Sequence, residues 1–286
     1  MTLALAALGS GLVLGFAVAL TAVGFTVIYN ATRVLNFANG QQMLLGGYVG
    51  LMLYVWLDLP FWLSLIAGAA AGFLLGVVLD RVMVGPLRNQ SVLTQVIALF
   101  AAANILDGVY LQVFGSQAYN LPPYASPVGV VPGLSLSPQD LAIIGSCAVL
   151  VLAVLWLLYR TEFGVQMRAT AENPVSAALV GIDPRLVSTM AWGMGGAMAA
   201  LAGLLLMPKF ILSPDVGQNF TFDAFAAVAV GGFGSLTGAI IGGVVIGLAE
   251  AAVDTFVAAG YEPLVSLGVM LLVLAIRPTG LVGERA

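Results

Sequence analysis

Few side chains in this 286-residue sequence could take part in chemistry. Glu250 and Asp254 stand four residues apart, so on a helix their carboxylates share a face and could relay a proton or a cation. Asp254 lies near the predicted outer end of its helix and Glu250 one turn deeper, and this position favours a pair at the lipid headgroups. Histidine is absent and Cys147 is the single cysteine, which excludes ordinary zinc sites, histidine-dependent nucleophiles and disulfides. We therefore expect no catalytic residue and no metal site.

Four amide side chains gather around Gly40 at residues 36–42, in the polar segment 30–42 that lies between two apolar runs. Polar groups at membrane depth are costly unless they face a cavity or a partner helix. A polar segment interrupted by a glycine is typical of the broken helices that line substrate routes. The alternative is an inner loop that merely joins two spans. The predicted pathway residues here are Asn36, Asn39, Gln41 and Gln42.

A further polar pair, Asn104 and Asp107, lies one helical turn apart near the predicted outer end of the fourth span. Asn104 and Glu250 complete the candidates for the pathway. For Asp107, a position at headgroup level is the simpler interpretation.

The segment 160–185 holds six of the 22 charged side chains and separates the uncharged runs Leu141–Tyr159 and Leu186–Pro208. Its three arginines predict a cytoplasmic location. Asn173 followed by Pro174 is a helix-start signal, and Gly181 is the matching stop. Val175, Ala178 and Leu179 then share one face of a two-turn helix. This ridge could dock in a groove of a soluble partner or lie on lipid headgroups.

The elements that must position these residues are membrane-spanning helices. Hydrophobic residues make up 61% of the chain and charged ones 8%, against roughly 25% charged in a soluble domain. Long apolar runs without alternation predict an all-α polytopic bundle of nine crossings, with eight or ten as alternatives. Residues 222–235 are short for a span and could be re-entrant. Three arginine groups placed inside put the C-terminus in the cytoplasm.

The chain is predicted to form a single transmembrane domain, residues 1–286, packed through small residues. Gly68, Gly72 and Gly76 recur every four residues, which lets helix backbones approach closely in lipid. The net charge of −4 is sorted by side, and no nucleic-acid partner is expected.

Five sequence blocks resemble one family. RATAENPVSAALVGID with GGAMAALAGLLL, RVLNFANGQQMLLGGYV, GGFGSLTGAIIGGVVIGLAEA and RPTGLVG are similar to blocks of the permease subunits of ABC importers for branched-chain amino acids. They span residues 20 to 283 in the family's order. The chain departs from the pattern at Asn39, where the better-known amino-acid members have histidine, and this weakens any transfer of substrate identity.

The resemblance implies an inner-membrane permease for branched-chain or other small amino acids, amides, urea or small carboxylates, working by alternating access. Its expected partners are a second, homologous permease subunit, two cytoplasmic ATPases and an extracytoplasmic solute-binding protein. The segment 160–185 would be the coupling loop. The coupling positions, with the cap Asn173–Pro174, are Arg168, Ala169, Ala171, Glu172, Ala178, Leu179 and Gly181.

ATP and magnesium would bind in those ATPases. A phosphate-cradling loop needs Gly-x-x-x-x-Gly-Lys-Ser/Thr, and the only lysine here, Lys209, follows Met207 and Pro208. Two alternatives stay open: a gradient-driven secondary transporter or channel that uses Glu250 and Asp254, and a membrane scaffold that transports nothing.

Overall fold

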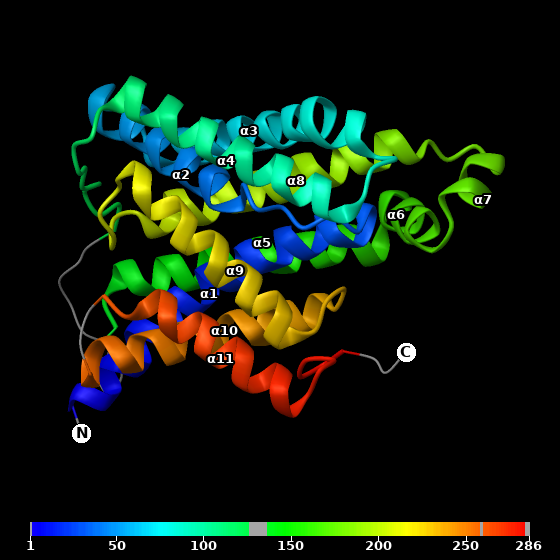
Figure 1. Ribbon diagram of the computed structural model, residues 1–286. Helices are drawn as coiled ribbons and strands as arrows, with labels where there is room; N and C mark the ends of the chain where they lie inside the picture. Colours follow the sequence, from blue (N-terminus) through cyan, green and yellow to red (C-terminus); the bar gives the residue numbers. More distant parts are fainter. Residues whose placement is uncertain (1, 126–135, 258–259, 284–286) are drawn as a thin grey trace.

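The computed structural model describes residues 2–125, 136–257 and 260–283, which form a bundle of helices (Figure 1). Helices follow from the long apolar runs, because a helix satisfies its backbone hydrogen bonds within one segment. The α-helices are α1 (Thr2–Thr32), α2 (Asn39–Gly50), α3 (Phe61–Leu79), α4 (Val92–Phe114), α5 (Pro138–Arg160), α6 (Glu162–Glu172), α7 (Pro174–Leu179), α8 (Pro184–Leu206), α9 (Gly217–Gly231), α10 (Leu236–Phe256) and α11 (Glu262–Ile276). Shorter turns are the π-helical η1 (Leu51–Trp56) and η2 (Asp80–Val84), and the 3₁₀ turns η3 (Gly85–Leu87) and η4 (Pro214–Val216).

The all-α prediction is confirmed. Within the described residues, six helices are long and apolar enough to cross a bilayer: Leu3–Thr32, Phe61–Leu87, Val92–Phe114, Pro138–Arg160, Pro184–Leu206 and Leu236–Phe256. Three shorter segments, α2 with η1, α9 and α11, accompany them. The count of nine crossings and the cytoplasmic C-terminus stay predictions, since they depend on how those short segments lie in the membrane.

Helix starts follow local capping chemistry. The Ser137 side chain accepts from the Asp140 N–H, and the Asp140 carboxylate accepts from the Ser137 N–H, which makes a capping box for α5. α5 therefore begins at Pro138, three residues before the uncharged run Leu141–Tyr159, and residues 115–137 form the loop between α4 and α5. Residues 126–135 of that loop lie outside the described residues.

One side chain of this loop fastens it to the bundle. The Tyr124 ring stacks on Phe61 with centroids 4.0 Å apart, and its hydroxyl donates to the Leu205 carbonyl oxygen at 3.3 Å. Burial raises the pKa of Tyr124 well above its ordinary value, so the hydroxyl stays a neutral donor.

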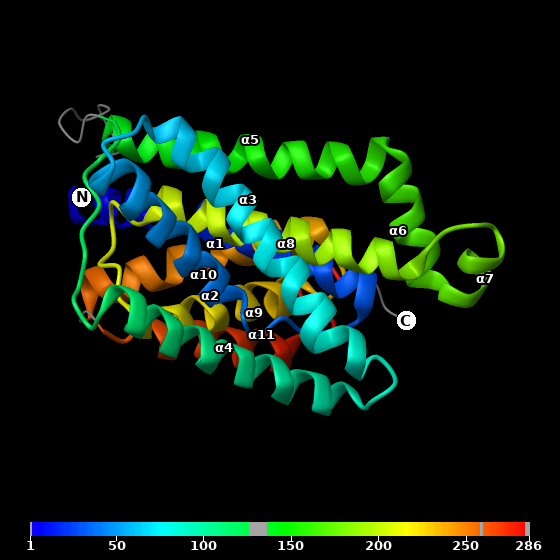
Figure 2. The ribbon, with the colours of Figure 1, turned by 90° about the horizontal axis from the view of Figure 1, so that it is seen from above.

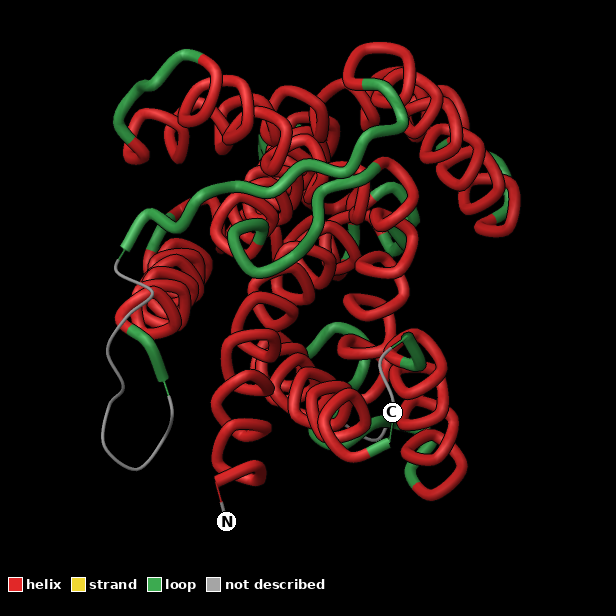
Figure 3. Tube along the Cα trace, turned by 90° about the vertical axis from the view of Figure 1, so that its left-hand side faces the viewer, coloured by secondary structure: helices red, strands yellow, loops and turns green. Residues whose placement is uncertain are grey.

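Most of α1 is buried by its neighbours, and Figure 3 shows the bundle nearly end-on. α3 crosses α8 at close range: a Cβ at Gly72 would overlap the carbonyl oxygen of Gly196, and one at Gly76 would overlap that of Trp192. A Cβ at Gly68 would lie 3.0 Å from Leu204 Cδ1, which is the end of a flexible side chain. Close approach of two backbones is what small residues at this spacing permit.

The two ends of the bundle differ. α6 and α7 stand clear of it at the end where α4 and α8 begin, which we call the α7 end (Figure 2). The opposite end, the far end, holds the first turns of α1 and α5 and the last turns of α10 (Figure 1). The site residues fall into groups along this axis.

Candidate functional site

The four amides predicted to line the pathway lie inside the bundle. Asn36, Asn39, Gln41 and Gln42 have no exposed surface. The chain is non-helical only over residues 33–38, and α2 begins at Asn39, so Gly40 lies within the first turn instead of breaking a helix. The segment is therefore more than a connecting loop: it returns into the bundle before α2 starts (Figure 1).

Asn36 closes the start of α2. Its Nδ2 donates to Gln42 Oε1 at 2.8 Å, and its Oδ1 accepts from the Ala38 N–H at 3.1 Å. Short polar side chains often satisfy the free N–H groups of a first turn in this way. Both polar atoms of the Asn36 amide therefore take part in hydrogen bonds within the fold.

The first turn of α2 packs against α9 and α4. The Gly40 N–H donates to Thr221 Oγ1 at 2.9 Å, and a Cβ at Gly40 would overlap the carbonyl oxygen of Gly217, so only glycine fits. Gln41 Nε2 lies 3.3 Å from Asp107 Oδ1 on α4. The Tyr110 hydroxyl donates to the Gln41 carbonyl oxygen at 2.7 Å.

Several amide atoms in this turn have no hydrogen-bond partner within the described residues: Asn39 Nδ2 and Oδ1, Gln41 Oε1 and Gln42 Nε2. An unsatisfied buried polar atom costs about 1–3 kcal/mol. Such atoms occur where water or a solute can supply the missing bonds. The turn that begins α2 is therefore the strongest pathway candidate among the predicted residues.

The structure does not bring every candidate to this turn. Asn104 is exposed on α4 and donates to its own helix, at the Phe100 carbonyl oxygen. Asp107, which the sequence favoured as a headgroup-level residue, instead contacts the buried Gln41 amide. No local signal gives that contact, because 66 residues separate the two side chains.

Glu250 belongs to a different cluster. Asp254 is exposed, as a headgroup-level position predicts, but Glu250 is 2% exposed. The Ser266 hydroxyl contacts Glu250 Oε1 and lies 2.7 Å from Asp223 Oδ1. Two carboxylates from α9 and α10 thus meet at one hydroxyl of α11, which the sequence analysis did not foresee.

The predicted short helix in the segment 160–185 is present as α7. Asn173 Oδ1 accepts from the N–H groups of Val175 and Ser176, both at 3.0 Å, and Pro174 is the first helical residue. Gly181 has φ +87°, and the Ile182 N–H reaches the Ala177 carbonyl oxygen at 3.1 Å. This is a Schellman ending, which favours glycine at that position.

α7 presents an apolar ridge to its surroundings. Val175 is 70% exposed, Leu179 84% and Val180 76%, while Ala177 is buried. Ala178 and Glu172 are exposed beside this ridge. A solvent-facing apolar ridge on a capped helix suits insertion into a groove.

α6 holds this segment on α5. Arg168 Nη1 donates to the Leu158 carbonyl oxygen at 2.7 Å, and a Cβ at Gly164 would overlap the same oxygen. Ala171 and Pro174 line a cavity of about 270 Å³. Ala169 carries the carbonyl that ends α6, since it accepts from the Asn173 N–H at 3.1 Å.

Sequence reasoning missed a buried carboxylate at the α7 end. Asp80 is 1% exposed and accepts from Ser188 Oγ at 2.7 Å, from Thr189 Oγ1 at 2.6 Å and from Arg88 Nη2 at 3.2 Å. Asp80 therefore links the connection between α3 and α4 to the first turns of α8, the helix that follows α7. An aspartate at the end of an apolar run, beside an inner loop with Arg88, was the only signal for it.

Comparison with known proteins places these groups in a family. Residues 7–274 match the family described as "Branched-chain amino acid transport system / permease component". The permease protein LivH of a high-affinity branched-chain amino acid transport system from Salmonella typhimurium is 32% identical, over 96% of this chain and 94% of its own. The probable LivH of Methanocaldococcus jannaschii is also 32% identical, over 92% and 88%.

A solved structure shares the fold. PsaBC from Streptococcus pneumoniae, in complex with Fab, aligns with a TM-score of 0.51 over 94% of this chain and 91% of that chain. The sequence identity is 16%, so this likeness concerns the helix arrangement alone.

Proposed function

The chain belongs to the family of permease components of branched-chain amino acid transport systems, and from that premise we propose that it is the membrane-spanning subunit of an ATP-driven importer. It is a multi-pass protein of the inner membrane. The proposed cargo is a branched-chain or other small amino acid, with amides, urea and small carboxylates as related candidates. The proposed partners are a second, homologous permease, two cytoplasmic ATPases and an extracytoplasmic solute-binding protein.

The observation that carries the proposal is the exposed apolar ridge of α7. Leu179 and Val180 are more than three-quarters exposed, on a helix capped at both ends. Because the sequence lacks a phosphate-cradling loop, ATP would have to be hydrolysed in a separate subunit. A rigid ridge held on α6 is suited to receive motion from such a subunit.

In this proposal, the hydrogen bonds of Asp80 transmit that motion to the rest of the bundle. α7 is followed at once by α8, whose first turns donate two hydroxyl hydrogen bonds to Asp80 on the α3 side. A movement of α7 would thus be transmitted to α3 and α8 together, since the buried bonds resist separation. In this proposal, alternating access at the start of α2 follows from that displacement.

The proposal is tested by replacing Glu172 and Leu179 together with alanine and co-purifying the chain with its ATPases. Both side chains are exposed, so insertion and folding should be retained while ATPase association and uptake are lost. The matched control is Leu57→Ala with Asp58→Asn, an exposed pair between α2 and α3. Undiminished ATPase association and uptake in the α7 variant would refute the proposal.

One observation favours a second candidate function, gradient-driven transport. Ser266 contacts both Glu250 and Asp223, and a hydroxyl has one proton to donate, so a proton could be held between the carboxyls. This candidate predicts uptake by the chain alone in proteoliposomes, abolished by an uncoupler and indifferent to ATP.

A further inference from the structure

A cavity of about 270 Å³, which we call the α7-end cavity, lies where α6 and α7 join the bundle. Its walls come from the end of α1 and the chain after it, the connection between α3 and α4, and the first turn of α4. The end of α6 and the starts of α7 and α8 complete them. Its two charged lining residues are Arg33, directly after α1, and Arg88, shortly before α4. A ligand bound there would contact both the α6–α7 segment and the bundle.

The backbone of Arg33 has a conformation that favours glycine. α1 ends at Thr32, and Arg33 follows with φ +59°, while its N–H donates to the Tyr29 carbonyl oxygen at 2.7 Å. Glycine is the usual residue at such a left-handed helix ending, because a side chain is strained there. Strained residues of this kind cluster at functional sites, where the side chain is needed in spite of the strain. The position of Arg33 therefore indicates a role for its guanidinium group.

Both guanidinium groups can bind an anion. Arg33 is exposed, lies over the Tyr29 ring at 5.5 Å from its centroid, and makes no ion pair with any residue that the structure describes. Arg88 binds Asp80 through Nη2 alone, at 3.2 Å from Oδ1, and a guanidinium group has five N–H donors. Asp80 offsets one of the two positive charges, so Arg33 supplies the excess. The planar fork of arginine N–H groups matches the oxygens of a phosphate group.

Two further lining side chains have polar atoms without hydrogen-bond partners. Thr170 on α6 and Gln95 on α4 are more than nine-tenths buried. Neither Thr170 Oγ1 nor Gln95 Oε1 has a partner within the described residues. Both atoms lie beneath the surface of the lining, so a ligand would reach them through a change of side-chain rotamer. The Thr170 hydroxyl could then donate to a phosphate oxygen, and Gln95 Oε1 could accept from a hydroxyl of the same ligand.

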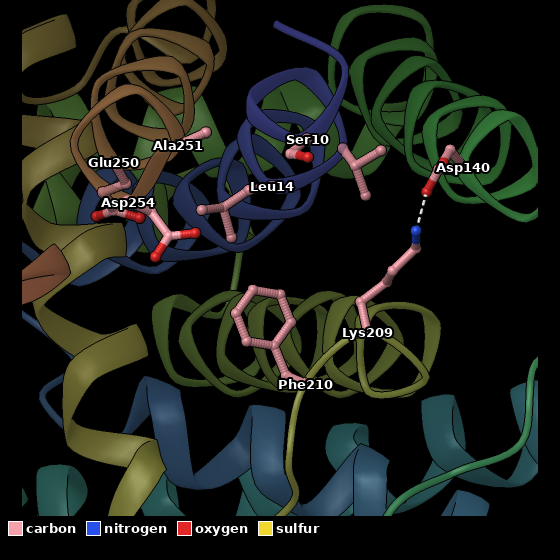
Figure 4. A pocket seen from close by; sticks show the side chains of 9 residues that line it. Ser10, Leu14, Asp140, Lys209, Phe210, Glu250, Ala251 and Asp254 are labelled. Carbon is pink, nitrogen blue, oxygen red and sulfur yellow. Dashed lines mark ion pairs between the residues drawn. The ribbon is translucent and has the colours of Figure 1, made fainter. Parts of the chain in front are cut away.

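A second cavity, of about 260 Å³ at the far end, shows that charged lining residues alone do not indicate a ligand (Figure 4). There the Lys209 ammonium group forms an ion pair with Asp140, and Glu250 contacts the buried Ser266 hydroxyl. These groups are already bonded within the protein. Arg33 in the α7-end cavity has no such carboxylate among the described residues.

We propose that the α7-end cavity binds an anion that carries a phosphate group and a neighbouring hydroxyl, with the phosphate at Arg33 and Arg88. Basic pockets between membrane helices suit the headgroups of anionic phospholipids. Phosphatidylglycerol has this chemistry, and a soluble glycerol phosphate presents the same groups. The volume is below the roughly 300–1,000 Å³ of pockets for drug-sized molecules, which suits a phosphate with a few further atoms. The site goes beyond the proposed function and stands whether or not the chain imports an amino acid.

The test measures binding of radiolabelled glycerol 3-phosphate to the full chain in nanodiscs of phosphatidylcholine. Arg33→Gly should raise the dissociation constant about tenfold or more, because it removes a charge-assisted contact. Without the probe, its thermal midpoint should equal or exceed that of the wild type, since glycine relieves the backbone strain. A residue needed only for folding would show the opposite change in midpoint. Arg33→Lys should bind with intermediate affinity, because it keeps the charge and loses the fork.

The matched control is Arg81→Gln, which removes the same charge from an exposed arginine outside the lining of this cavity. It should leave binding unchanged. Equal losses of affinity in Arg81→Gln and Arg33→Gly would show that surface charge alone attracts the anion, and the proposal would then be wrong.

A second probe distinguishes the lipid from the soluble ligand. The full chain is purified from membranes that contain phosphatidylglycerol, and native mass spectrometry measures the lipid that stays bound. Retention of phosphatidylglycerol by the wild type but not by Arg33→Gly, without affinity for glycerol 3-phosphate, assigns the site to the headgroup. Binding of glycerol 3-phosphate that depends on Arg33 assigns it to a soluble phosphate. If the wild type binds neither probe, the proposal is overturned.

Hydrogen exchange locates the bound anion. Amide exchange over α6 should slow when either probe binds, because Thr170 then joins a contact that links α6 to Arg33 and Arg88. Arg33→Gly should abolish this protection at the same probe concentration. Unchanged exchange over α6 with the probe bound would mean that the anion binds elsewhere, and the α7-end cavity would not be its site.

Discussion

Two buried polar regions of this bundle differ in how completely their hydrogen bonds are satisfied. At the α3–α8 contact, both oxygens of Asp80 accept bonds, from Ser188, Thr189 and Arg88. At the first turn of α2, Asn39 is equally buried, but both its amide atoms have no hydrogen-bond partner within the described residues.

This difference separates a structural joint from a site that exchanges partners. A satisfied buried network holds one geometry, because every alternative leaves polar groups unpaired. A turn with unpaired amides has no such preference and can bond to water or to a passing solute. Burial of a polar side chain therefore does not by itself indicate the pathway, and we propose that unpaired amides clustered in one turn do.

The largest expected effect is at Asp80. Asp80→Asn replaces an acceptor by a donor that faces two hydroxyls and Arg88, and we expect it to lower the free energy of unfolding by about 3 kcal/mol. Thermal denaturation in detergent measures this, with the exposed Asp58→Asn as the isosteric control. Equal midpoints for the two variants would show that the Asp80 network is not a structural joint.

A smaller loss is expected where α3 touches α8 without hydrogen bonds from side chains. Gly76→Ala places a methyl group against the Trp192 carbonyl and should cost about 1–3 kcal/mol, as overpacking does. Gly145 on α5 has nothing within 4 Å of a Cβ, so Gly145→Ala should be neutral or stabilising by up to about 1 kcal/mol. Equal changes in the free energy of unfolding for Gly76→Ala and Gly145→Ala, measured in the same denaturation assay, would contradict this expectation.

At the start of α2, the effect of a substitution on the free energy of unfolding should have the opposite sign. Asn39→Leu removes two unpaired polar atoms, so stability should stay the same or rise by about 1 kcal/mol, while uptake falls. Asn36→Leu is the matched control, because Asn36 makes both of its bonds, and it should lose about 1–2 kcal/mol. Destabilisation by Asn39→Leu as great as that by Asn36→Leu would remove the distinction between the two regions.

The smallest effect on stability is expected at α7. Leu179→Ser changes an 84% exposed side chain and should alter the free energy of unfolding by less than about 0.5 kcal/mol. Leu205→Ser, at a 1% exposed position of α8, is the destabilising comparison. A large loss of stability from Leu179→Ser in the isolated chain would mean that the ridge packs within the permease instead of serving a partner.

The sequence anticipated elements whose signals are local. α7 is capped by Asn173, begins at Pro174 and is followed by Gly181 in the left-handed conformation, as the capping pattern predicts. The amides near Gly40 were selected because polar residues in an apolar setting stand out. The sequence did not reveal which of them are satisfied, since the partners of Gln41 and Gly40 lie on α4 and α9.

Contacts between residues that are far apart in the sequence were not predicted, for the same reason. Asp80 meets Ser188 and Thr189 across 108 and 109 residues, and Glu250 was paired by its spacing with Asp254, although Ser266 holds it beside Asp223. An i, i+4 spacing establishes a shared helix face, but it does not establish what covers that face.

The sequence by itself determined that this chain is a helical membrane protein and that a short capped helix joins two spans. Those properties depend on hydropathy and on contacts within about four residues along the chain. Only the tertiary structure decided that the Asp80 carboxylate is fully hydrogen-bonded, that the Asn39 amide has no partner among the described residues, and that Lys209 and Glu250 line one cavity. Each of these depends on how helices distant in sequence pack against one another, and side chains on separate helices meet only once that packing is complete.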